Sequence, residues 1–124
     1  MTTGPVIVTH TGVDGVCPSQ RNLADKHIQR VVERGGLIGI GYDPFFNCDL
    51  GVKAIVNSIR YVADRYGVEH VALGSDFDGT ILAPFDTAGL ALLTDELIAS
   101  GFSPGEIHMV MGDNVINFLL HRLP

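Results

Sequence analysis

The sequence is poor in cations and contains no long apolar run, and both shortages exclude classes of function. Eight lysines and arginines stand against fourteen acidic residues, which gives a net charge of −6. The cations do not cluster, and this argues against a nucleic-acid partner and an anionic membrane surface, because phosphate binding needs grouped positive charges. No apolar stretch approaches the ~20 residues that cross a bilayer, and the N-terminus lacks a basic region followed by an apolar signal core. We therefore expect a cytoplasmic protein without a membrane segment.

Cysteine is scarce as well. The two cysteines, Cys17 and Cys48, are not spaced like a CxxC metal or redox motif. Both are expected in loops that follow strands, on the same face of a parallel sheet. Without a signal peptide we expect two reduced thiols, and a disulfide between the two loops is the alternative.

The 124 residues are 46% hydrophobic, which suits one folded domain over residues 1–124. Three short apolar runs end abruptly at polar residues. Val6–Thr9 stops at His10, Leu37–Gly41 stops at Tyr42, and Val71–Gly74 leads to Asp76. Such runs are typical of strands buried on both faces, so we expect three strands that bring a His, a Tyr and an Asp to one edge of a sheet.

Helical patterns lie between and after these strands. Asn22 is expected to cap a helix that ends at Gly35–Gly36. A second helix covers Val52–Tyr66 and stops at Gly67, and a third covers Ala88–Ser100. Ser103 and Glu106 form a capping box for a fourth helix, which Gly112 can interrupt. The third helix should bury Leu90, Leu93, Leu97 and Ile98.

Strands that alternate with helices predict an α/β fold with a parallel sheet. A sheet of three strands has one central strand and two exposed edges. The chain therefore looks like part of a larger structure.

Two residues at the strand ends suggest chemistry. His10 is a candidate metal ligand, because imidazole binds zinc and a strand end fixes its direction. Asp76 could ligate a metal, or hold and deprotonate its bound water. Asp78 is expected to be structural, in a tight turn where it bonds to nearby backbone amides and Gly79 takes a positive φ. The remaining histidines are expected at the surface: His27, His70, His108 and His121.

Asp76–Thr80, with the sequence DFDGT, is also similar to the opening motif of haloacid-dehalogenase-type phosphatases. That family needs a later lysine, and none follows Lys53. An EF-hand loop is excluded, because Gly79 occupies the fourth position and Thr87 the twelfth, where Glu is needed. The phosphatase stays a minor alternative.

Taken together, five stretches resemble the C-terminal part of the membrane (renal-type) dipeptidases, metallopeptidases of the amidohydrolase-like barrels. They occur in the family's order across essentially the whole chain: Val6–Thr11, Arg21–Leu23, Glu33–Ile40, His70–Gly79 and Gly112–Asn114. The resemblance implies the C-terminal portion of a (β/α)8 TIM barrel, about three βα units plus a terminal helix, with Asn114 as a helix cap.

The resemblance also implies zinc-dependent hydrolysis of dipeptides at a two-zinc site. In that picture His10 resembles a metal ligand, Arg21 the residue that grips the substrate carboxylate, and Asp76 the acid that handles the proton of the attacking water. Because a catalytic zinc takes three protein ligands, this chain lacks most of them. We expect a fragment that pairs with the missing N-terminal part of the barrel or associates with itself. The alternative is a non-catalytic assembly or binding module derived from the barrel.

Overall fold

Three parallel strands form the centre of the computed structural model, which describes residues 3–124. They are β1 (Ile7–Thr11), β2 (Leu37–Ile40) and β3 (Val71–Leu73), in the spatial order β1-β2-β3. Every residue of β2 is buried, as suits the central strand. In β1, by contrast, Ile7, Thr9 and His10 are exposed. The expectation that the first strand is covered on both faces is therefore wrong, because three of its five residues are exposed among residues 3–124.

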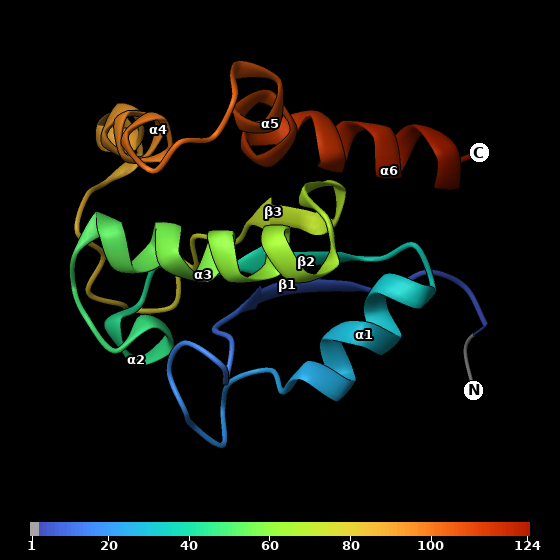
Figure 1. Cartoon of the computed structure of the whole chain (residues 1–124), viewed down its shortest axis with the longest axis horizontal. Coiled ribbons are helices and arrows are strands. Elements are labelled where there is room, and N and C mark those ends of the chain that lie inside the picture. Colours follow the sequence, from blue (N-terminus) through green and yellow to red (C-terminus); the bar gives the residue numbers. More distant parts are fainter. Residues whose placement is uncertain (1–2) are drawn as a thin grey trace.

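Helices surround this sheet on several sides (Figure 1). In that view α1 (Asp25–Glu33) lies below the strands, α3 (Val52–Tyr66) lies in front of them, and α5 (Pro104–His108) and α6 (Asn114–Arg122) lie above. The remaining helices are α2 (Pro44–Asn47) and α4 (Leu90–Ala99), and the short turns are η1 (Val68–His70), η2 (Thr87–Gly89) and the π-helical η3 (Met109–Asp113). None of the helices within residues 3–124 has the length and apolar character needed to cross a membrane.

Helix α3 supplies much of the core. Ile55, Ile59 and Val62 are almost fully buried, at spacings that place them on one face of the helix. Leu93 of α4 and Ile28 of α1 join the same cluster. Each such side chain stabilises the fold by roughly 1.5–3 kcal/mol relative to an exposed one. The predicted bounds of this helix and its stop at Gly67 are confirmed.

Two of the predicted helices differ in detail from the prediction. Asn22 does not cap the first helix, whose N-cap is Ala24 without a side-chain hydrogen bond. The third predicted helix begins later than Ala88, because Asp86 accepts a hydrogen bond from Gly89 N–H and starts a 3₁₀ turn there. Ile98 is 59% exposed rather than buried, and Leu90 is only partly buried, whereas Leu93 and Leu97 are fully buried as predicted.

The C-terminal segment follows its sequence signals more closely. Ser103 and Glu106 form the predicted capping box, and the helix is interrupted at Gly112 by a π turn. Asn114 is buried, but it does not cap the terminal helix. Its side-chain amide donates hydrogen bonds to the carbonyl groups of Val68 and Val71, both at 2.8 Å. Asn114 therefore fastens α6 to the start of β3.

Candidate functional site

His10 and Asp76 lie together at the carboxyl end of the sheet. The Nε2 atom of His10 is 3.9 Å from Oδ1 of Asp76, and the side chains are 47% and 19% exposed. The other ring nitrogen of His10, Nδ1, lies 3.0 Å from Oγ1 of Thr9. The two residues that sequence reasoning selected from strand ends are thus neighbours, and one ring nitrogen of His10 faces the carboxylate.

A local irregularity of β1 produces this approach. The register of β1 against β2 shifts between Val8 and Thr11, so the backbone of Thr9 and His10 leaves the regular ladder. A Cβ atom on Gly74 would lie 2.1 Å from the Thr9 carbonyl oxygen and 3.0 Å from Cα of His10. The missing side chain of Gly74 therefore makes room for the segment that carries His10.

Asp76 has an unusual backbone. Its φ is 60°, in the left-handed region that non-glycine residues seldom adopt, and Thr80 has the same φ. A Cβ atom on Gly79 would lie 2.4 Å from Oδ1 of Asp76, so the glycine leaves space for the carboxylate. The positive φ predicted for Gly79 is therefore found at Asp76 and Thr80 instead. Backbone held in this region clusters at functional sites.

Asp78 was expected to bond to backbone amides in this turn. Among residues 3–124 its side chain makes no hydrogen bond, and it is exposed. The turn is closed by the peptide N–H of Gly79, which donates to the Asp76 carbonyl oxygen at 2.9 Å. Its closure therefore depends on the backbone rather than on the Asp78 carboxylate.

Tyr42, the third residue predicted at this edge, is buried rather than presented to solvent. It is 2% exposed, and burial raises the pKa of its phenol from 10.0 to about 12. Its ring packs against Phe77 and Phe85, with ring centroids 5.5 and 5.1 Å away. Because Phe77 follows Asp76 directly, Tyr42 anchors the Asp76 loop by aromatic contact.

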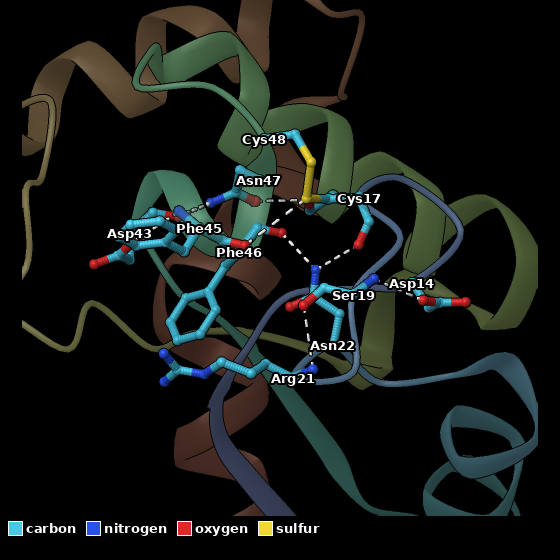
Figure 2. The surroundings of a disulfide bond; sticks show 11 residues. Asp14, Cys17, Ser19, Arg21, Asn22, Asp43, Phe45, Phe46, Asn47 and Cys48 are labelled. Atoms are coloured by element: carbon cyan, nitrogen blue, oxygen red, sulfur yellow. Dashed lines mark hydrogen bonds between the residues drawn. A yellow bond between two sulfur atoms is a disulfide. The ribbon is translucent and has the colours of Figure 1, made fainter.

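Arg21 lies in the loop that follows β1 (Figure 2). Its peptide N–H donates to Oγ of Ser19 at 3.2 Å, and its guanidinium carbon lies 5.5 Å from the centroid of the Phe46 ring. The guanidinium forms no ion pair with any residue in the described part of the chain. Its N–H groups are therefore available to an anionic group from outside this chain segment.

Two links join the Arg21 loop to the turn that follows β2. A disulfide connects Cys17 and Cys48, with their Cα atoms 5.5 Å apart. The side-chain amide of Asn22 donates to the carbonyl groups of Cys17 and Phe46, at 2.7 and 2.9 Å. The prediction of two reduced thiols is wrong, because the two strand-end loops meet closely enough for the sulfur atoms to bond.

The remaining histidines lie away from the site. His27, His108 and His121 are exposed, as predicted. His70 is partly buried, and its Nδ1 lies 2.9 Å from the carbonyl oxygen of Gly36. The surface assignment of His70 is therefore wrong, since the ring bridges the entries of two strands.

A hollow of about 300 Å³ lies at the other end of the strands, beside α6. Leu37, His70 and Arg122 are among the residues that line it. None of the three predicted site residues reaches this hollow. We place the candidate site at the carboxyl ends instead, where barrel enzymes carry their catalytic residues.

The donors at the site do not complete a metal centre within this chain. No group of three or more His, Cys, Asp or Glu side chains suited to a metal ion occurs among residues 3–124. His10 offers one imidazole and Asp76 one carboxylate, and both types of donor suit zinc. A catalytic metal would need additional ligands from outside the described residues.

Sequence reasoning missed two residues near the carboxyl ends of the strands. Phe46 packs beside both Arg21 and His10, and Asn22 bridges the two loops instead of capping a helix. The placement of Cys17 and Cys48 on one face of the sheet was the available signal for the contact between these loops. Nothing in the sequence distinguished Phe46 from the neighbouring Phe45, which is 75% exposed.

Comparison with known proteins gives one consistent result. The family model described as membrane dipeptidase (peptidase family M19) matches residues 1–120. A dipeptidase of Aspergillus oryzae, aclJ, is 32% identical over 127 residues, covering 96% of this chain and 30% of its own length. An uncharacterised Klebsiella pneumoniae protein encoded in the pqqA 5′ region is 37% identical over 109 residues, covering 81% of this chain and 40% of its own.

Solved structures agree with these matches. The crystal structure of dipeptidase AC, an M19 metallopeptidase, aligns with a TM-score of 0.88 at 27% identity over 95% of this chain and 38% of its own. A metallopeptidase from Rhodobacter sphaeroides, liganded with a phosphinate mimic of the dipeptide L-Ala-D-Ala, aligns with a TM-score of 0.87 at 27% identity. The alignment covers 94% of this chain and 36% of the metallopeptidase. The predicted fold class, a portion of a TIM barrel, is confirmed. The chain spans less than half the length of these relatives.

Proposed function

We propose that this chain, which belongs to the membrane dipeptidase family (peptidase family M19), supplies part of the active site of a zinc-dependent enzyme that hydrolyses dipeptides. The observation that carries this proposal is the approach of His10 to Asp76, 3.9 Å apart at the carboxyl ends of the strands. An imidazole and a carboxylate at that edge suit metal-assisted hydrolysis.

Each of the three site residues has a distinct role in this proposal. His10 would be one zinc donor. Asp76 would accept a proton from the attacking water and pass it to the leaving amine, the usual work of a carboxylate base. Arg21 would bind the free carboxylate of the dipeptide, because a guanidinium presents paired N–H donors that match a carboxylate. The chemistry supplied by zinc, when bound, is a more acidic water and a polarised peptide carbonyl.

The dipeptide substrate has support from two relatives. The Aspergillus oryzae protein is named a dipeptidase, and the Rhodobacter sphaeroides metallopeptidase binds a dipeptide mimic. A small substrate with a free carboxylate also explains why Arg21, exposed and without an ion pair among residues 3–124, lies against the same Phe46 ring as His10.

A test of these roles uses the full-length protein that contains this segment. His10→Ala should reduce the zinc content, whereas Asp76→Asn should keep the zinc and lower the turnover of a dipeptide by about 10²-fold or more, the usual contribution of a general base. Zinc is measured by atomic absorption and turnover by release of free amino acid. Equal zinc loss in both variants would overturn the assigned roles.

The second candidate is a non-catalytic module that binds the remaining barrel units or a second copy of itself. Its support is that β1 and β3 each pair on one side only within residues 3–124, and open parallel edges favour association. Sedimentation of the 124-residue chain tests it, and a monodisperse monomer would count against it. We do not propose the phosphatase, because the membrane dipeptidase family model covers residues 1–120, including the DFDGT motif.

The cytoplasmic location stays a proposal. It rested on the sequence pattern alone, and the Cys17–Cys48 disulfide weighs against it, because disulfides persist mainly in oxidising compartments. Thiol labelling of the protein in intact cells would decide between the cytoplasm and an oxidising compartment, since the reducing cytoplasm predicts two free thiols.

A further inference from the structure

The ring of Phe46 contacts two of the three site residues. The guanidinium carbon of Arg21 is 5.5 Å from the ring centroid, and the His10 ring centroid is 6.4 Å away, tilted by 48°. Figure 2 shows the side chain of Arg21 extending along the ring of Phe46. Phe46 itself is only 5% exposed, so both site residues lie against a buried ring.

Several restraints hold this ring in place. The Phe46 carbonyl accepts a hydrogen bond from the Asn22 amide at 2.9 Å, and the disulfide follows two residues later at Cys48. One edge of the ring lies against Gly41, where a Cβ atom would be 2.4 Å from Cδ2 and 2.7 Å from Cε2 of Phe46. The side-chain amide of Asn47 donates to the Gly41 carbonyl at 2.9 Å. The ring is therefore a rigid surface fixed from two strand-end loops.

Arg21 is restrained much less. Its side chain is exposed, and the contact with Phe46 is the one interaction of its guanidinium found within residues 3–124. A guanidinium that lies over an aromatic ring keeps its in-plane N–H donors free for a carboxylate. The ring can therefore hold the direction of Arg21 without competing for the group that Arg21 would bind.

We propose that Phe46 is a positioning residue that orients Arg21 toward the carboxylate of the substrate. This inference rests on the proposed function, because it takes Arg21 as the carboxylate-binding residue. Phe46 acts through Arg21 and touches none of the reacting atoms. A contact with the substrate carboxylate, remote from the scissile bond, affects binding of ground state and transition state alike, so its loss should raise KM and spare kcat.

The test compares Phe46→Leu with the unchanged, full-length zinc-loaded protein on two substrates, a dipeptide and its C-terminal amide. For the dipeptide, KM should rise about two- to fivefold, the size expected for an exposed cation–π contact, with kcat retained. The amide should show no change, because it has no carboxylate for Arg21. Phe46→Tyr should behave as the unchanged protein, and Phe45→Leu is the matched control, since Phe45 is 75% exposed.

A second readout does not depend on activity. In protein labelled with ¹⁵N at arginine, the Nε–H resonance of Arg21 should carry a ring-current shift that Phe46→Leu removes and Phe46→Tyr keeps. An equal loss of activity toward dipeptide and amide would overturn the proposal, because it would mean that the ring only supports the fold. So would an unchanged Arg21 resonance.

Arg21→Ala separates this proposal from the function on which it rests. This variant should raise KM for the dipeptide at least tenfold, the size expected for a lost charged hydrogen bond, and leave the amide unaffected. If Arg21→Ala treats both substrates alike, the role of Arg21 is wrong. If Arg21→Ala discriminates between them and Phe46→Leu does not, only the positioning role of Phe46 is wrong.

Discussion

The two halves of the candidate site are held in different ways. The Arg21 loop is joined to the turn after β2 by the Cys17–Cys48 disulfide and by the hydrogen bonds of Asn22. The Asp76 loop has no comparable link within residues 3–124. It is anchored by the packing of Phe77 against Tyr42, and its backbone takes a positive φ at Asp76.

This difference matches the work that each half is proposed to do. A residue that binds a remote carboxylate needs a fixed direction, which covalent and hydrogen-bonded links between loops provide. A proton-transfer residue needs a carboxylate pointed at one place, and an unusual backbone conformation can point it there at some cost in stability. The three predictions below change one half at a time.

The largest effect is expected from removing the disulfide. Cys17→Ser/Cys48→Ser should lower the free energy of unfolding by about 3–4 kcal/mol in the loop-entropy model, since the bonded residues are 31 apart in the sequence. Urea unfolding measures the change. Amide resonances should move in the Arg21 loop and stay in place around Asp76.

The control for this prediction is to repeat the unfolding of both proteins in the presence of a reductant. The unchanged protein should lose stability in dithiothreitol, and the double variant should not respond to it. Equal stability of the two proteins under oxidising conditions would mean that the hydrogen bonds of Asn22 alone hold the loops together.

An intermediate effect is expected at high pH from Tyr42, which anchors the other half. Its pKa rises from 10.0 in the unfolded chain to about 12 in the fold, so the fold favours the neutral phenol. The stability from this shift is complete below pH 10 and is lost as the pH rises to about 12, by at most about 3 kcal/mol. Tyr42→Phe should lose less stability than the unchanged protein between pH 10 and 12.

Urea unfolding across this pH range provides the measurement. Tyr61→Phe is the control, because Tyr61 lies outside the site and is only partly buried. Its pKa is also raised, first by burial and then by Asp25, so its effect should have the same sign and a smaller size. Parallel stability curves for Tyr42→Phe and the unchanged protein would contradict the prediction.

The fold was largely predictable from the sequence, because apolar runs and helical patterns are local signals. The three strands, the helix Val52–Tyr66 and the break at Gly112 all follow from such patterns. The proximity of His10 and Asp76 was also predictable, since parallel strands end at one edge.

The contacts between loops were not predictable in the same way. Asn22 has the residue type and position of a helix cap, yet its amide bonds to two carbonyl groups of the meeting loops. The pairing of Cys17 with Cys48 depends on the same tertiary approach. The positive φ of Asp76 could not be predicted either, because glycine is the residue that usually adopts it, and the glycine of this turn is Gly79, three residues later.

The smallest effect is expected from the backbone of the Asp76 loop. Thr80 has φ of 60°, which is unfavourable for a β-branched residue, so Thr80→Gly should stabilise the protein by about 1 kcal/mol. Asp76→Gly should gain less, because aspartate tolerates this region better, and only this variant should lose dipeptide hydrolysis. Asp78→Gly is the matched control: Asp78 has no positive φ, so glycine should cost about 0.5–1 kcal/mol there. If all three variants shift stability in the same direction, the left-handed backbone stores no strain, and the Asp76 carboxylate is held by the packing of Phe77 alone.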